Sequence, residues 1–206
     1  MLRRDWTATL LSVAGGNANI SYFQANRARF SNSSNSTVAG NLSGGSAFLT
    51  VDTATVTLTG DLTVQSNPPG QSIWITQGGT VSLNGNALST PGQIGNDGII
   101  NLQNGTIDCS TRNGGPGGRV RGPGTINGNL IIAAGATSQI GEPGLSATVS
   151  VNGDLTLEAG ASSLFEITDQ GNDFLAVSAN ASISGQLQVN FTATTFVVGQ
   201  IHRDDV

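Results

Sequence analysis

A short pattern built around glycine recurs along the chain and constrains its fold more than any other feature. An aliphatic residue, a polar residue, glycine, a small polar residue and a second apolar residue follow one another, as in Leu58–Leu62 (LTGDL) and Val151–Leu155 (VNGDL). A repeat of roughly 20–25 residues is typical of one solenoid coil. The glycines of the pattern lie 20 to 32 residues apart and are Gly40, Gly60, Gly85, Gly105, Gly128, Gly153 and Gly185.

The residues around each glycine indicate short strands joined by bends. Alternation of apolar and polar residues is the period of a strand with one buried face. Glycine beside Asn or Asp permits a positive φ, so the chain can turn there. No segment shows capped helical periodicity, and the pattern therefore predicts a right-handed parallel β-helix of roughly eight or nine coils. Strands are expected at Thr55–Leu58, Ile73–Thr76, Thr80–Leu83, Ile99–Leu102, Asn129–Ala133, Thr148–Val151, Ser163–Ile167 and Phe174–Val177.

Stacked coils place equivalent residues on top of one another. We expect Leu62, Leu130 and Leu155 to share one interior stack, with Asn129 and Asp154 outside it. Asparagines at equivalent outer positions can form hydrogen-bonded ladders. An antiparallel β-sandwich also uses short strands and glycine turns, but it does not predict a shared turn pattern at near-constant spacing. If one turn repeats, these glycines stack near one edge: Gly60, Gly85, Gly128 and Gly153.

The composition agrees with a β-helix and excludes other classes. Only 10% of the 206 residues are charged, with 8 Arg, no Lys and 13 acidic residues, and the net charge is -5. Charged residues at equivalent positions of stacked coils would lie next to residues of the same charge and repel one another, so a β-helix is expected to contain few charged residues. A nucleic-acid partner is not expected because phosphate contacts need cations. No apolar run is long enough for a membrane-spanning helix, and the single cysteine, Cys109, excludes an internal disulfide.

The chain is predicted to have three parts. Residues 1–30 contain four aromatic side chains, Trp6, Tyr22, Phe23 and Phe30. They are expected to form an irregular N-terminal cap, because the end of a solenoid must cover the core with residues unlike those of the repeat. Residues 31–191 are the repeat body, in which the Gly- and Pro-rich stretch 110–124 is expected to protrude as a loop. Residues 192–206 carry the only histidine, His202, and have the character of a truncated tail. The N-terminus is not predicted to be a signal peptide.

Several segments resemble bacterial autotransporter passenger domains and the autotransporter-associated β-strand repeats of large surface proteins. They are Thr37–Val64, Ile126–Ala136, Val149–Ile167 and Asn172–Phe191. The resemblance covers about three quarters of the chain. It implies a secreted or outer-membrane-anchored β-helix at the bacterial cell surface, serving as an adhesin or structural stalk. An extracellular glycan or another surface ligand is the partner that it implies.

One segment is a candidate calcium site. Residues 169–175 (DQGNDFL) are similar to one copy of the calcium-binding repeat of β-rolls. Calcium needs six to eight oxygen ligands, and β-rolls supply them by stacking several copies. Since Asp169, Asn172 and Asp173 form a single copy, we expect an outward loop whose Phe174 and Leu175 pack inward, and no bound metal.

A few residues also raise the possibility of catalysis. A polysaccharide hydrolase needs two carboxylates on one groove, and a lyase needs a base and fixed cations. The available groups are Asp97, Asp108, Arg112, Arg119 and Arg121. The threonine-rich run at 53–59 resembles one coil of an ice-binding surface, and the glycines of 114–124 lack the lysine of a phosphate loop. The favoured prediction is a non-enzymatic surface stalk without cofactor; a polysaccharide-acting β-helix or a glycan-, ice- or calcium-binding module is the alternative.

Overall fold

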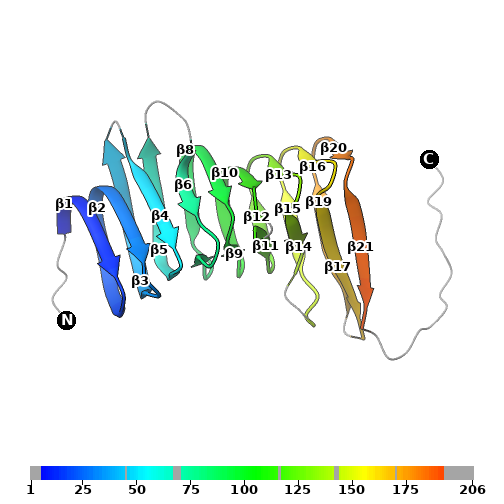
Figure 1. Cartoon of the computed structure of the whole chain (residues 1–206), viewed down its shortest axis with the longest axis horizontal. Helices are drawn as coiled ribbons and strands as arrows, with labels where there is room; N and C mark the ends of the chain where they lie inside the picture. Colours follow the sequence, from blue (N-terminus) through cyan, green and yellow to red (C-terminus); the bar gives the residue numbers. More distant parts are fainter. Residues whose placement is uncertain are drawn as a thin grey trace.

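The computed structural model is an all-β parallel solenoid of about eight turns (Figure 1). It describes residues 6–44, 46–66, 71–115, 117–141, 144–169 and 171–192. Strands β1 and β21 lie at opposite ends of an elongated body (Figure 1). All strand pairings between described residues are parallel except β17 with β18, which form an antiparallel hairpin. The predicted parallel β-helix is therefore confirmed.

Each turn contributes a strand segment to three faces, as the pairings show. The first face contains β12 (Gly124–Ile126), β15 (Thr148–Val151) and β19 (Phe174–Val177). The second contains β4 (Phe48–Asp52), β6 (Gln71–Ile75), β13 (Leu130–Ile132), β16 (Leu155–Leu157) and β20 (Ala181–Ile183). The third contains β7 (Thr80–Ser82), β9 (Ile99–Asn101), β11 (Arg119–Arg121), β14 (Thr137–Gln139), β17 (Ser162–Thr168) and β21 (Gln186–Phe191).

Longer strands bend from one face to the next. They are β1 (Trp6–Ala14), β2 (Asn17–Ser31), β3 (Asn35–Gly44), β5 (Thr55–Ser66), β8 (Ala87–Asn96) and β10 (Gly105–Asn113). The hairpin strand β18 (Gly171–Asn172) follows β17. The expected strands all occur, and two of them, Thr148–Val151 and Phe174–Val177, have the predicted bounds.

The interior is built from ladders of buried aliphatic side chains. On the first face, Leu62, Leu88, Ile107, Ile126, Val151 and Val177 follow one another in register. Consecutive members of this ladder lie 26, 19, 19, 25 and 26 residues apart. On the second face, Leu130 pairs with Leu155, and Leu155 with Ala181. All three predicted leucines are buried, but the prediction of one shared stack is wrong because Leu62 belongs to the other ladder.

The repeated glycines occupy more than one corner of the solenoid, so the prediction of a single edge is also wrong. Gly60 and Gly85 lie where the third face turns into the first, whereas Gly128 and Gly153 lie between the first and second faces. Coils of different length place the same local pattern at different corners. Of the seven, only Gly85 has a positive φ, of 79°.

Close packing between coils explains the glycine requirement at most of these positions. A Cβ on Gly128 would lie 2.5 Å from the backbone of Cys109, and one on Gly153 would lie 2.5 Å from the carbonyl oxygen of Gly128. No real side chain tolerates such contacts with backbone. At these positions glycine is required by the approach of adjacent coils, and not by the left-handed turn that the sequence pattern suggests.

Two other expectations about organisation need correction. The irregular backbone expected for residues 1–30 is not found in their described part, because β1 and β2 pair with each other and β2 pairs with β3. The predicted loop at 110–124 is partly regular, since β10 extends to Asn113 and β11 covers Arg119–Arg121. Residues 193–206 of the predicted tail, including His202, lie outside the described residues. The division into cap, body and tail stays a prediction.

Asparagine ladders form both outside and inside the solenoid. At the corner between the first and second faces, Asn152 donates to Asn127 at 2.8 Å, and Asn127 donates to Asp108 at 2.6 Å. This outer ladder agrees with the prediction. A second ladder, in which Asn96 donates to Asn113 at 2.9 Å, is fully buried. Side-chain hydrogen bonds thus join consecutive coils at the core as well as at the surface.

Candidate functional site

Trp74 is an exposed aromatic side chain on the outer surface of the solenoid. In β6, Ile73 and Ile75 point into the core and are fully buried, so Trp74 projects from the opposite side of the strand. Its side chain remains 43% exposed. In register with Trp74 lie Thr50 on one neighbouring coil and Gly95 on the other. The indole therefore projects from the middle of the second face, beside a position that carries no side chain.

Polar groups surround the indole. Its Nε1–H points to Oδ2 of Asp97 at 3.4 Å, on the next coil. The Gln71 side chain covers Gly95, because a Cβ at Gly95 would lie 2.6 Å from Cδ of Gln71. Arg112 follows Gly95 in the same outer column, one coil further on. We call Gln71, Trp74, Gly95, Asp97 and Arg112 the Trp74 surface.

The cations near this surface are paired with carboxylates. Arg112 contacts Glu158 through two nitrogens, at 2.9 and 3.4 Å, and this hydrogen bonding lowers the pKa of Glu158 below the usual carboxyl range. Arg29 lies 3.1 Å from Asp52 at the other end of the second face. The pairs neutralise charge along the face, although exposed pairs of this kind contribute little to stability.

The structure does not gather the candidate catalytic residues into one site. Asp97 lies at the end of the second face, whereas Asp108 lies at the corner between the first and second faces, where it accepts a hydrogen bond from Asn127. Arg112 is on the second face, but Arg119 and Arg121 are on the third. Arg121 donates to Asn101 of the adjacent coil at 2.7 Å.

Eight carboxylates of the described residues instead join consecutive coils. Each accepts at least one hydrogen bond from a donor 19 to 26 residues away along the sequence, which is one turn of the solenoid. The acceptors are Asp52, Asp61, Asp97, Asp108, Asp154, Glu158, Glu166 and Asp173.

The candidate calcium residues do not form an open oxygen cage. Asp173 is buried and accepts backbone hydrogen bonds from Ala147 at 3.1 Å and Glu166 at 2.8 Å. Burial raises the pKa of the Asp173 carboxyl, and the nearby charge of Glu166 adds to this effect. Asn172 is exposed and Asp169 lies in the hairpin turn. Phe174 is 55% exposed, so the expectation that it packs inward is wrong. Leu175 is half-buried and packs against the core, as expected.

The threonine-rich run does not continue into a regular array. Thr55 and Thr57 face outward on the third face and pair with Asn35 and Thr37 before them, and with Thr80 and Ser82 after them. The next coils place Ile99 and Asn101, and then Arg119 and Arg121, at the same positions. Arginine interrupts the flat hydroxyl lattice that an ice-binding surface would need.

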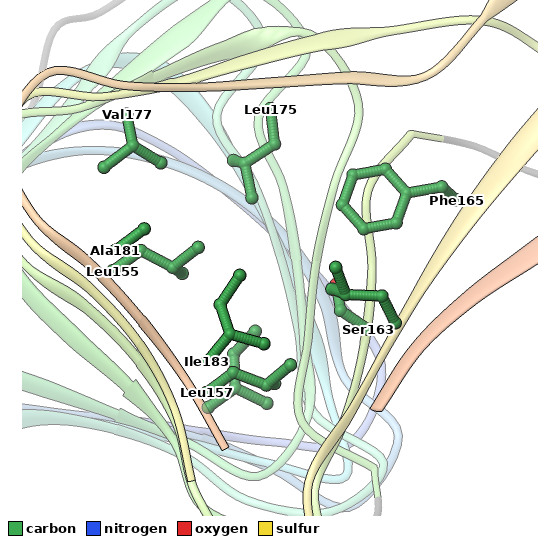
Figure 2. Close-up of a pocket in the computed structure, with 10 residues that line it drawn as sticks. Leu155, Leu157, Ser163, Phe165, Leu175, Val177, Ala181 and Ile183 are labelled. Atoms are coloured by element: carbon green, nitrogen blue, oxygen red, sulfur yellow. The ribbon is translucent and has the colours of Figure 1, made fainter. Parts of the chain in front are cut away.

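A cavity of about 210 Å³ opens at the last described turn (Figure 2). Leu155, Leu175, Val177, Ala181 and Ile183 point into it from the first and second faces (Figure 2). These side chains continue the interior ladders, and Ile183 is 48% exposed because no later described coil covers it. The cavity is therefore the open end of the hydrophobic core.

The other groups considered are the Cys109 thiol and clusters of metal-binding side chains among the described residues. Burial raises the pKa of the Cys109 thiol to about 12, so it stays protonated. The described residues contain no group of three or more His, Cys, Asp or Glu side chains suited to hold a metal ion. None of them forms a helix long and apolar enough to cross a membrane.

Sequence reasoning missed Trp74, although a signal was present. The alternation Ile73-Trp74-Ile75 already places the indole opposite the two isoleucines of a strand whose interior side is apolar. Comparison with known proteins found no matching family model, no matching curated protein and no matching solved structure.

Proposed function

We propose that the chain is a non-enzymatic, rod-like part of a secreted or cell-surface bacterial protein, where it serves as a stalk or adhesin. The observation that carries this proposal is the use of its carboxylates. Asp61 and Asp154, for example, accept backbone hydrogen bonds from the next coil at 2.8 and 3.0 Å. Acids that hold coils together are not positioned as a catalytic pair around a sugar.

Two further observations support a stalk. The stacked coils make the body elongated, and such solenoids are extended by adding similar coils. The segments Thr37–Val64 and Val149–Ile167 resemble passenger repeats of surface proteins. Disulfide bonds are not needed in such a protein because each coil is stabilised by its neighbours.

Surface exposure on intact cells tests this proposal. Antibodies raised against the purified chain should label intact cells of the source bacterium, and external protease should remove the label. A cytoplasmic protein of the same cells is the control, because it should remain unlabelled and uncleaved. Labelling that appears only after lysis would contradict a surface stalk.

A further inference from the structure

We propose that the Trp74 surface binds a neutral polysaccharide. The inference rests on the proposed function, because it specifies what an adhesive rod holds. Trp74 supplies an aromatic ring on a sheet face, and the flanking polar groups of Gln71 and Asp97 supply hydrogen bonds. Together they offer the two kinds of contact that a sugar ring makes, one apolar and one polar.

The indole is placed as a stacking platform. A tryptophan that serves only to fill the core would be buried, yet Trp74 is 43% exposed while its neighbours Ile73 and Ile75 are fully buried. Gly95, in register with Trp74 on the adjacent coil, has no side chain of its own, and the Gln71 side chain lies over that position. Tryptophan combines a large apolar face with a polar edge, and its ring can pack against the C–H groups of a hexose.

The polar groups beside the ring are suited to sugar hydroxyls. The Asp97 carboxylate anchors the indole N–H at 3.4 Å and has further lone pairs that can accept hydrogen bonds from a hydroxyl. The exposed Gln71 amide can both donate and accept. A few convergent polar groups next to an aromatic ring fix the orientation of a bound ligand.

The charges favour a neutral polymer over an anionic one. Arg112 is held by Glu158 through two hydrogen bonds, and Arg29 is held by Asp52. The chain as a whole carries a net charge of -5, which repels polyanions. Trp74 and Arg112 are two coils apart, a distance of roughly 10 Å that a short oligosaccharide can span.

Affinity electrophoresis with soluble polysaccharides tests the site. The probes are a β-glucan, a mannan and a galactan, with polygalacturonate as the anionic comparison. At least one neutral polymer should retard the wild-type chain, and Trp74→Ala should weaken that binding by about tenfold or more, as expected for a central aromatic contact. Trp74→Phe should keep part of the affinity, because a smaller aromatic ring remains.

Matched variants separate binding from folding. Tyr22 is also exposed, at 40%, but lies away from the second face, so Tyr22→Ala should bind like wild type. Tryptophan fluorescence should change on binding in Trp6→Phe but not in Trp74→Phe. Retardation by polygalacturonate alone, by none of the probes, or equally in Trp74→Ala and wild type would overturn the site. Any of these results combined with surface labelling of cells would leave the stalk proposal standing.

Discussion

Oδ1 of Asn129 accepts a hydrogen bond from the backbone N–H of Asp154, one coil further along the chain, at 2.9 Å. The contact is repeated one coil later, where Oδ1 of Asp154 accepts from the backbone N–H of Asn180 at 3.0 Å. The residues that follow Asn129 and Asp154 in sequence, Leu130 and Leu155, pair inside the core. Each of these coils therefore carries an outer polar link directly beside an inner apolar contact.

The two kinds of contact differ in their contribution to stability. Leu130→Asp or Leu155→Asp should lower the free energy of unfolding by several kcal/mol, because it buries a carboxylate without a partner. Asn129→Ser should cost only about 1 kcal/mol, since the freed backbone N–H of Asp154 can bind water. Urea unfolding of the three variants measures the difference. Equal midpoints would show that the assignment of inside and outside is wrong.

The glycines should respond to substitution according to their surroundings. Gly128→Ala should be strongly destabilising because its Cβ would overlap the backbone of Cys109. Gly85 has a φ of 79° with open space around it, and Asn tolerates this conformation, so Gly85→Asn should cost at most about 1 kcal/mol. Thermal melting of both variants provides the comparison. A Gly85→Asn variant less stable than Gly128→Ala would contradict the packing explanation.

Cys109 should react with thiol reagents only when the protein opens. The residue is 8% exposed and the pKa of its thiol is about 12, so thiolate is scarce at neutral pH. Labelling by iodoacetamide at pH 8 should be slow in the native chain and fast in urea. Native labelling as fast as that of a free thiol in solution would mean that the corner around Cys109 is open to solvent.

Asp173 should make the stability depend on pH in a defined direction. Its pKa in the folded state is raised, so the folded state holds the proton more tightly than the unfolded state does. This contribution favours folding at low pH and is lost as pH rises through the folded pKa. Asp173→Asn should remove that decline, whatever its effect on absolute stability. Melting curves of both proteins between pH 3 and 7, roughly the range in which carboxyl groups titrate, test the sign; identical slopes would contradict it.

The sequence predicted the repeat and its strands well because alternation is a local property. Residues such as Val149 and Val151 show by their spacing alone which side of a strand is buried. Register between coils is not local. The ladder partners Ile107 and Ile126 are 19 residues apart but Ile126 and Val151 are 25 apart, so the spacing of the glycines could not reveal which corner each one occupies.

The candidate site was harder to predict for the same reason. Trp74, Asp97 and Arg112 are spread over 39 positions of the sequence and come to lie along one face only through the stacking of coils. The resemblance of residues 169–175 to one calcium repeat makes Asp173 a weak calcium candidate, but it does not reveal that the carboxylate is buried. The Asp173 carboxylate accepts hydrogen bonds from the backbone N–H groups of Ala147 and Glu166. Both residues lie outside the segment, so the segment alone cannot predict these contacts.

The proposal of a non-enzymatic stalk is tested most directly by asking whether the chain cleaves polysaccharide. Purified protein is incubated with pectin, alginate and neutral glucans, and new reducing ends and the ultraviolet absorbance of unsaturated uronates are measured. A structural stalk should give no product above a heat-denatured control, because Asp97 and Asp108 lie at opposite ends of the second face and each accepts a hydrogen bond from the adjacent coil. Product formation that is lost in Asp97→Asn or Asp108→Asn would contradict it.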